Sequence, residues 1–226
     1  MKLNHLAIIM DGNRRWAISN NLPSYHGHQK GADNLWNMIN DIDNYSFKYL
    51  TVFIFSTENW KRSKKEISFL MKLLNKFLDD TISKIKNENI KIRFIGDFSV
   101  FNKKIQNKLH LIINETLNNT GVTVSLALNY GGRSDIILAL NKILKNNSIS
   151  EIIREHDFKK FTLNGDLPYP DLLIRTGGEK RLSNFLLWDL AYTELMFLDK
   201  MWPDFNKATL EKCINNFNKT VRNYGV

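Results

Sequence analysis

Five short segments of the chain are almost continuously apolar and rich in β-branched residues. They cover residues 6–10, 50–55, 90–95, 122–128 and 172–174. A strand with one face in water alternates apolar and polar side chains, whereas a strand buried on both faces does not. The five segments therefore predict strands of a sheet that is covered on both sides.

Amphipathic segments with helical spacing separate these predicted strands. The clearest covers residues 64–89, where apolar side chains recur at steps of three and four residues. The other predicted helices cover residues 28–43, 102–117, 134–144 and 207–222. Strands that alternate with helices predict a mostly parallel central sheet covered by helices. We therefore expect a single α/β domain that spans residues 1–226.

Polar segments follow directly after the predicted strands. They cover residues 11–16, 56–62, 96–97, 129–133 and 175–181, and they are rich in arginine, asparagine and glycine. In open parallel sheets, ligands bind just beyond the carboxyl ends of the strands. Free backbone N–H groups and helix N-termini bind phosphate, and arginine binds it through two parallel hydrogen bonds. This edge of the sheet is therefore predicted to bind a phosphate-rich ligand.

Net charge narrows the class of partner only in part. The chain has 226 residues, with 32 Lys and Arg against 23 Asp and Glu, which gives a net charge of +9. An anionic partner suits this balance, whether nucleic acid, a phosphorylated small molecule or an acidic membrane face. The absence of several motifs narrows the function further. The sequence has no Walker A loop and no G-x-G-x-x-G loop, which argues against ordinary NTPases and dinucleotide-binding proteins. It also lacks a zinc-type Cys/His cluster, the G-x-S-x-G elbow of hydrolases and a D-D-x-x-D motif.

Cysteine content and the distribution of charge bear on location. Cys213 is the only cysteine, so an internal disulfide is excluded, a reducing cytoplasm fits, and a core position in the last helix is expected. Asp11, Arg14 and Arg15 interrupt the N-terminal apolar run too early for a secretory signal. The sequence contains no stretch of about twenty uncharged apolar residues, the length needed to span a bilayer. We expect a soluble protein that is at most peripheral to a membrane.

Residues after the first strand have two interpretations when each is taken alone. Asp11 could cap the next helix or bind a ligand, and Arg14 and Arg15 could be solvated or hold an anion. Trp16 adds a flat apolar face beside them, which suits a ligand with a charged head and an oily tail. The basic residues at 61–65 could be a solvated helix entry or contact anionic lipid.

Other polar residues also leave alternatives open. Arg175 and Arg181 flank a Thr-Gly-Gly segment and could hold one diphosphate or be surface charges. His26 and His28 could form a metal pair, but no third ligand is evident, so hydrogen bonding to a ligand or cap is preferred. Glu194 lies among apolar residues, where an unpaired carboxylate is costly, so it is either an edge residue or a ligand.

Longer motifs resemble one protein family, in the same order along the chain. They are H-x-A-I-I-M-D-G-N-x-R-W-A (5–17), G-H-x-x-G (27–31), F-S-T-E-N-W-x-R (55–62), I-G-D (95–97), N-Y-G-G-R (129–133), D-L-L-I-R-T-G-G-E-x-R-L-S-N-F-L-L-W (171–188), A-Y-T-E-L (191–195) and W-P-D-F (202–205). The chain resembles the cis-prenyltransferases and, within them, the bacterial undecaprenyl diphosphate synthases.

This resemblance implies a homodimer with a hydrophobic tunnel and Mg²⁺ as the cofactor. It implies sequential condensation of isopentenyl diphosphate onto farnesyl diphosphate with new cis double bonds. The product would be undecaprenyl diphosphate, the lipid carrier for cell-wall polysaccharide synthesis. The resemblance also implies a cytoplasmic enzyme, with peripheral contact at the inner face of the plasma membrane for product release, and no nucleic-acid partner.

The resemblance also assigns roles to residues. Asp11 matches the Mg²⁺ and diphosphate aspartate, Asn59 the residue that helps to accept the proton, and Glu194 a second metal carboxylate that reaches across the dimer. The residues matched to the allylic substrate site are Gly12, Asn13, Arg14, Arg15, Trp16, His28, Ser56, Thr57, Glu58, Trp60 and Arg62. Those matched to the isopentenyl diphosphate site are Arg175, Arg181, Leu182 and Ser183.

The chain departs from the family pattern at four places. Ser24 stands where the family often has an arginine, and Lys180 stands where a histidine is common. Ile54 replaces a small residue, which could narrow the tunnel and shorten the product. The C-terminal residues 222–225 match only loosely. Three alternatives are therefore kept: a shorter-chain synthase, a non-catalytic partner subunit, and an RNA-binding module that the charge alone would suit.

Overall fold

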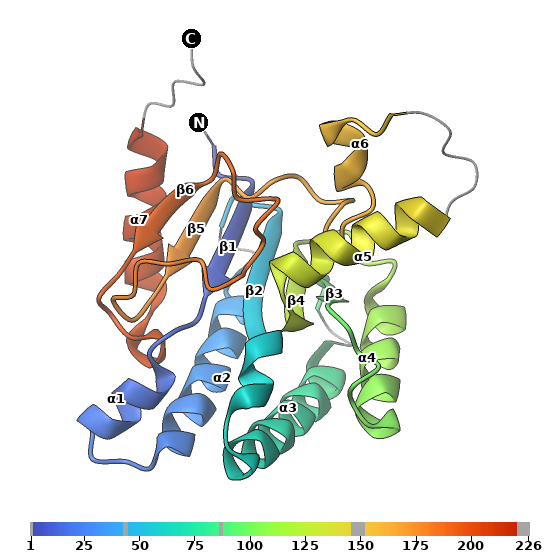
Figure 1. The fold of residues 1–226 in the computed structure, drawn as a ribbon. Coiled ribbons are helices and arrows are strands. Elements are labelled where there is room, and N and C mark those ends of the chain that lie inside the picture. The colour runs from blue at the N-terminus through green and yellow to red at the C-terminus, as the bar shows by residue number, and fades with distance from the viewer. Residues whose placement is uncertain (1, 43–44, 86–87, 146–151, 221–226) are drawn as a thin grey trace.

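All strands that the structure describes belong to one parallel sheet (Figure 1). The computed structural model describes residues 2–42, 45–85, 88–145 and 152–220. The strands within these ranges are β1 (His5–Ile9), β2 (Tyr49–Ser56), β3 (Lys91–Ile95), β4 (Thr123–Tyr130), β5 (Leu172–Arg175) and β6 (Glu194–Phe197). Their order is β3-β4-β2-β1-β5-β6, and every neighbouring pair is parallel. The carboxyl ends of β1, β2 and β5 therefore lie side by side.

Helices occupy most of the connections between the strands. They are α1 (Asn13–Ser19), α2 (Ser24–Asn40), α3 (Lys64–Lys84), α4 (Lys103–Thr116), α5 (Gly132–Lys145), α6 (Glu155–Lys159) and α7 (Lys207–Lys219). Short 3₁₀ turns at Thr57–Lys61 and Trp202–Asp204 follow β2 and precede α7. The first of these turns begins at the carboxyl end of β2, so it contributes polar residues to the same edge of the sheet as β1 and β5.

Both faces of the sheet are buried, as the apolar segments predict. Along β1, Leu6 and Ile8 pack into the larger core under α2, α3, α4 and α7, whereas Ala7 and Ile9 pack into a second core. Phe185 contributes to that second core from the irregular segment before β6. Alternate side chains of a strand point to opposite faces, so a strand between two cores is apolar at most of its positions on both faces.

The expected fold class and all five expected strands are confirmed, with shifts at element ends. The helix expected at 28–43 runs from Ser24 to Asn40, and the one expected at 64–89 ends at Lys84. The strand β6 and the helices α1 and α6 were not predicted: β6 is as short as β5 but only partly buried, and the two helices have only seven and five residues. Positions 86–87 and 221–226, which include the end of the helix expected at 207–222 and the loosely matching 222–225, lie outside the described residues.

The core position expected for Cys213 is confirmed. Its side chain is buried in α7, and burial raises the pKa of the thiol to about 11. A thiol that stays protonated at neutral pH is a poor nucleophile. Its burial and raised pKa are those of a cysteine that serves packing.

An irregularity at the end of β2 shapes the edge of the sheet. The register between β2 and β4 shifts between Phe53 and Phe55 and again between Phe55 and Ser56. As a result, the consecutive residues Ile54 and Phe55 both pack against the larger core. Such irregularities redirect side chains beside functional sites. Here the shift turns Ile54 toward the pocket described next.

Candidate active site

A pocket of about 410 Å³ lies at the carboxyl ends of β1, β2 and β5. Many of the residues assigned by resemblance meet in its wall. The assigned residues that line it are Asp11, Gly12, Asn13, Arg14, His28, Ser56, Asn59, Arg62, Arg175, Arg181 and Ser183. Three segments that follow strands converge on one site because parallel strands end at a common edge, and His28 joins them from α2.

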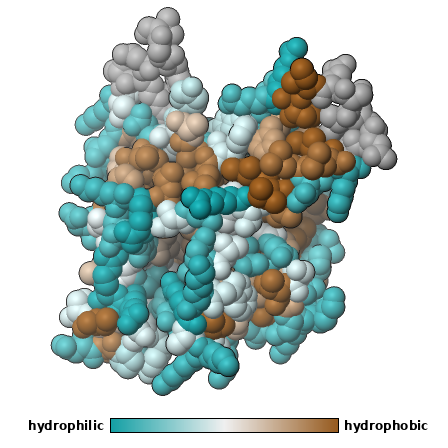
Figure 2. All heavy atoms as spheres, in the orientation of Figure 1, coloured by the Kyte–Doolittle hydropathy of each residue, from teal (hydrophilic) through white to brown (hydrophobic). Residues whose placement is uncertain are grey.

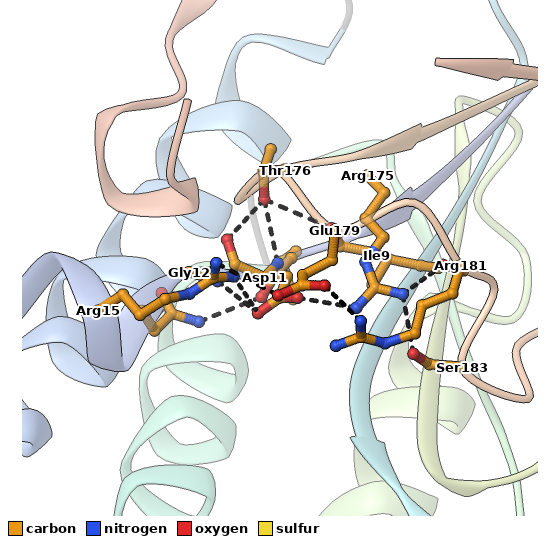
Figure 3. Close-up of polar contacts among 11 residues, drawn as sticks. Ile9, Asp11, Gly12, Arg15, Arg175, Thr176, Glu179, Arg181 and Ser183 are labelled. Carbon is orange, nitrogen blue, oxygen red and sulfur yellow. Dashed lines mark hydrogen bonds and ion pairs between the residues drawn. The ribbon is translucent and has the colours of Figure 1, made fainter. Parts of the chain in front are cut away.

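The centre of the site is an ion pair between Asp11 and Arg175 (Figure 3). Ile9 and Arg175 are partners in the β1–β5 ladder, so Asp11, two residues beyond β1, meets the end of β5. The Arg175 guanidinium is almost fully buried and donates from Nη2 to Asp11 Oδ2 over 2.8 Å. Its Nη1 donates to Ser183 Oγ, also over 2.8 Å, and to the carbonyl oxygen of Arg181. One planar fork therefore connects three segments.

The backbone around Asp11 is held as firmly as its side chain. The Thr176 hydroxyl donates to the Asp11 carbonyl oxygen over 2.7 Å and accepts from the Asp11 N–H over 3.0 Å. Asp11 Oδ1 accepts from the N–H of Gly12 over 2.6 Å. Asp11 is thus no side-chain cap of α1, whose N-cap residue is Gly12. The contacts preorganise the carboxylate toward the pocket.

Asp11 is held in its ionised form. Burial by itself would raise the pKa of this carboxyl, but the hydrogen bond from Arg175, the N–H of Gly12 and the charge of Arg15 outweigh burial and lower the pKa below its ordinary value. Hydrogen bonds and opposite charges that contact the charged form favour that form. At neutral pH the site therefore presents a carboxylate within an excess of guanidinium groups.

A second layer of charge surrounds this pair. Arg15 Nη2 lies 3.4 Å from Asp11 Oδ1, and Arg15 Nη1 lies 3.6 Å from Glu179 Oε1. Glu179 also pairs with Arg181 through its other oxygen. Gly177 allows this approach: its φ is +84°, and a Cβ there would lie 2.8 Å from Arg15 Nη2. The contacts of Glu179 were not expected from the sequence. It stands between Arg175 and Arg181, which were expected to bind diphosphate.

His28 enters the pocket from α2. A Cβ at Gly27 would lie 1.8 Å from the carbonyl oxygen of Asn13, so glycine lets α2 pack directly against the start of α1. Burial, together with the positive charges of Arg62 and Arg14, lowers the pKa of His28. The imidazole is therefore neutral at neutral pH and can donate or accept a hydrogen bond.

Metal binding by His26 and His28 finds no support in the structure. His26 is exposed, and its ring centroid lies 4.3 Å from that of Tyr25. Among the described residues, no group of three His, Cys, Asp or Glu side chains could hold a metal ion. The hydrogen-bonding interpretation of His28 is the one that its position in the pocket favours.

Asn59 lies in the 3₁₀ turn after β2. Its Oδ1 accepts from the N–H of Ser56 over 3.1 Å, and the Ser56 hydroxyl caps the turn in return. This reciprocal pair fixes the plane of the amide at the pocket wall. Asn59 is therefore held as a rigid polar group in the wall of the pocket.

The polar pocket continues into a narrow apolar cavity of about 100 Å³ between α2 and α3. Both parts share the lining residues Met10, Asn13, His28, Ile54, Phe55 and Leu70. The apolar part is closed by residues that include Leu35, Leu74, Phe77, Leu128 and Trp202. The site thus has a charged end and an apolar end, which suits an amphiphilic ligand.

Seven of the residues assigned by resemblance do not line the polar pocket. Of these, Arg15 contacts Asp11 and Glu179, and Leu182 packs against the second core. The Trp16 indole donates to Asp204, and the Trp60 indole donates to Asn129, each over 2.8 Å. Glu58 accepts a hydrogen bond from the side chain of Asn184, and Thr57 lines a separate pocket that includes Gly131.

Glu194 is the seventh, and it lies far from Asp11 within the chain. It begins β6 and pairs with Leu172 at the amino end of β5, whereas Asp11 lies beyond the carboxyl end of β1. Strands rise by about 3.3 Å per residue, so the length of β5 separates the two carboxylates. A single chain therefore does not bring them to one metal ion. Ser24 and Lys180 are both exposed, and neither lines the pocket.

Comparison of the sequence identifies relatives over the whole chain. The family model described as "Putative undecaprenyl diphosphate synthase" matches residues 9–225. The isoprenyl transferase of Neisseria gonorrhoeae is 45% identical over 221 residues, which are 98% of this chain and 88% of that protein. That of Rickettsia typhi is 40% identical over 99% of this chain and 98% of its own length.

Solved structures agree with the sequence comparison. Lavandulyl diphosphate synthase from Lavandula x intermedia, in complex with dimethylallyl diphosphate, matches with a TM-score of 0.94 and 35% identity, covering 100% of this chain and 99% of that one. A "probable undecaprenyl diphosphate synthase" from Campylobacter jejuni matches with a TM-score of 0.84 and 32% identity over all of both chains. The chain therefore belongs to the cis-prenyltransferases, the family of undecaprenyl diphosphate synthase.

Proposed function

We propose that the protein condenses isopentenyl diphosphate sequentially onto farnesyl diphosphate, with cis stereochemistry, to give undecaprenyl diphosphate for cell-wall polysaccharide synthesis. One observation carries the proposal: the Asp11–Arg175 centre opens directly into an apolar cavity. An allylic diphosphate has a charged head and an oily tail, and this site has a matching end for each.

The residues of the site have defined parts in this reaction. Arg175 and Arg181 bind and orient diphosphate, and their donors stabilise the charge that develops on a departing diphosphate. The apolar wall that includes Ile54 and Phe55 excludes water, which would otherwise capture an allylic cation. Neutral His28 donates a hydrogen bond to the allylic substrate, and Asn59 helps to accept the proton lost from the condensed product.

Mg²⁺ is the proposed cofactor, and the residues present fit it. Mg²⁺ in phosphate-binding sites is typically held by one or two carboxylates together with substrate phosphates and water. Asp11 supplies an ionised, partly exposed carboxylate beside the proposed diphosphate position. When bound, the metal would neutralise charge on the phosphates. Glu194 would join the metal site only from a second copy of the chain.

A second candidate function differs from the first only in the length of the product. A dry protein cavity of about 150 Å³ holds a single benzene ring, whereas the apolar cavity here measures about 100 Å³. The full undecaprenyl tail therefore requires α2 and α3 to move apart. A shorter-chain cis-prenyl diphosphate synthase is the alternative, and Ile54 in the shared wall of both pockets favours it.

The proposed assembly is a homodimer. Ile137, Leu140 and Leu144 are exposed on α5, and Tyr192 and Leu195 are exposed at and before β6. Figure 2 shows a band of apolar residues across the upper half of this face of the molecule. Large exposed apolar patches mark interaction sites. A second copy of the chain, with Glu194 beside this surface, is the partner that the family assignment favours.

We also propose a cytoplasmic location with peripheral contact at the inner face of the plasma membrane. None of the helices in the described part of the chain is long and apolar enough to cross a bilayer. Ile18, Leu22 and Tyr25 are exposed around the α1–α2 turn. The Tyr25 ring lies 5.5 Å from that of Phe69 on α3, whose first turn adjoins the basic residues at 61–65. Apolar and basic side chains together suit an anionic membrane surface.

Turnover of purified protein tests the proposal. The protein is incubated with farnesyl diphosphate, radiolabelled isopentenyl diphosphate and Mg²⁺, and the products are separated by chromatography. Asp11→Ala should lower the rate by about 10²- to 10³-fold or more, because it removes charge stabilisation at the diphosphate. Circular dichroism of the variant should be unchanged. A folded wild-type protein without turnover would instead support the non-catalytic partner subunit.

A further inference from the structure

Glu179 is an acidic residue placed between arginines that the proposed function assigns to diphosphate. Its Oε1 lies 3.6 Å from Arg15 Nη1, and its Oε2 pairs with Arg181 Nη1 (Figure 3). The two arginines come from α1 and from the segment after β5, so the carboxylate bridges the two sides of the site. Asp11, the other carboxylate here, pairs mainly with Arg175.

The two carboxylates differ in how firmly they are held. Arg175 is buried and donates hydrogen bonds to Asp11, Ser183 and the backbone carbonyl of residue 181. The side chains of Arg15 and Arg181, in contrast, are 44% and 60% exposed, and that of Glu179 is 37% exposed. Exposed ion pairs are weak because water screens them. The Glu179 contacts can therefore be exchanged for those of another anion, whereas the Asp11–Arg175 pair stays in place.

The backbone holds Glu179 at this position. Gly177 and Gly178 precede it, with φ of +84° and +80°. Their N–H groups donate to the carbonyl oxygens of Lys200 and Leu198, each over 2.8 Å. A loop fixed on both N–H groups presents the next side chain toward Arg15 and Arg181. The local backbone, rather than the weak ion pairs, determines where this carboxylate lies.

We propose that the Glu179 carboxylate competes with diphosphate for the Arg15 and Arg181 guanidinium groups and thereby limits how tightly the site retains pyrophosphate. A diphosphate carries more charge and more acceptor oxygens than one carboxylate, so it displaces Glu179 on binding. When pyrophosphate leaves, Glu179 takes back the same donors. Glu179 thus sets the affinity of the diphosphate site. The inference rests on the proposed function for the identity of the anion.

The test measures pyrophosphate binding without turnover. Isothermal titration calorimetry of the full chain with inorganic pyrophosphate, in EDTA and low salt, compares wild type with Glu179→Gln. Two exposed ion pairs are removed as competitors, so we expect binding about three- to tenfold tighter in the variant. The matched control is Glu155→Gln, the same charge change at an exposed position on α6. Weaker or unchanged binding in Glu179→Gln, or equal tightening in the control, would overturn the proposal.

A second background separates competition from positioning. In protein that carries both Arg15→Gln and Arg181→Gln, the donors for which Glu179 competes are gone, so adding Glu179→Gln should change pyrophosphate affinity no more than the Glu155→Gln control does. If Glu179 instead positioned the arginines for substrate, its removal would weaken binding in the wild-type background. Thermal unfolding of each variant checks that the fold is retained. Because no prenyl transfer is measured, failure of this proposal is distinct from failure of the proposed reaction.

Discussion

The Arg175 guanidinium makes contacts that a lysine ammonium cannot make together. It donates to Asp11 Oδ2 and Ser183 Oγ, each over 2.8 Å, and to the carbonyl oxygen of Arg181. Lysine at this position keeps the charge, but its three donors share one nitrogen and cannot replace a planar fork that donates from two nitrogens. Each hydrogen bond to a charged group contributes about 1.5–3 kcal/mol. Allowing for partial repair, Arg175→Lys should lose about 2–4 kcal/mol, which is roughly 30- to 1,000-fold in kcat/KM.

The assay is steady-state turnover of isopentenyl diphosphate with farnesyl diphosphate and excess Mg²⁺. Arg154→Lys, at an exposed position before α6, is the matched control and should keep wild-type kcat/KM. Circular dichroism and thermal unfolding check that Arg175→Lys remains folded. A folded Arg175→Lys protein with kcat/KM within about threefold of wild type would refute the view that the planar fork organises this site.

The same substitution has a signature in the pH profile. The hydrogen bond from Arg175 is the largest of the interactions that lower the pKa of Asp11 against the opposing effect of burial. Weakening this bond should raise the pKa of the carboxyl toward its ordinary value. The acid limb of the profile of kcat/KM should therefore move to higher pH in Arg175→Lys. An unmoved acid limb would mean that Asp11 does not control it.

Three further outcomes are expected. Burial lowers the pKa of His5 from 6.5 to about 4; the unfolded chain then binds the proton first as pH falls between these values, so urea unfolding should show stability about 2 kcal/mol lower at pH 5 than at pH 8. The fall should be clearly smaller in His5→Asn, where the lowered pKa of His28 still contributes to it, and a flat wild-type profile would contradict the assignment. Ile54→Ala widens the wall shared by the two pockets, so it should shift the products to longer chains; an unchanged distribution of product lengths would show that Ile54 does not limit chain length. If α5 lies in the proposed homodimer interface, Ile137→Asp should be a monomer in light scattering where the wild type is a dimer; a dimeric Ile137→Asp protein would exclude this face of α5 as the interface.

The strands of the core could be predicted because their environment is uniform. Ile8 and Ile9 face opposite sides of the sheet, yet both meet apolar cores, so the whole segment had to be apolar. The edge strand β6 escaped prediction because it is short and only partly buried. Its side chains carry no periodic signal that distinguishes a strand from a loop.

The pocket residues could be predicted in kind but not in arrangement. Arg175 and Asp11 each follow a predicted strand, and parallel strands end at one edge, so their approach was expected. The contact of Glu179 with Arg15 was not expected, because it depends on the backbone turn at Gly177 and on the packing of α1 beside this turn. Trp16 and Asp204 form a hydrogen bond across 188 positions of sequence, which no local pattern indicates.

The sequence by itself determined the fold class, the strands of the core and the chemical character of the site, including the acidic and basic residues that follow the first strand. These follow from burial and from short-range spacing, which the order of residues records directly. Only the tertiary structure decided which carboxylate pairs with which guanidinium, that Glu194 lies away from Asp11 in one chain, and that Ile54 turns into the pocket. Those features depend on strand order, register and a local shift in β2, and such relations exist only once distant segments are packed together.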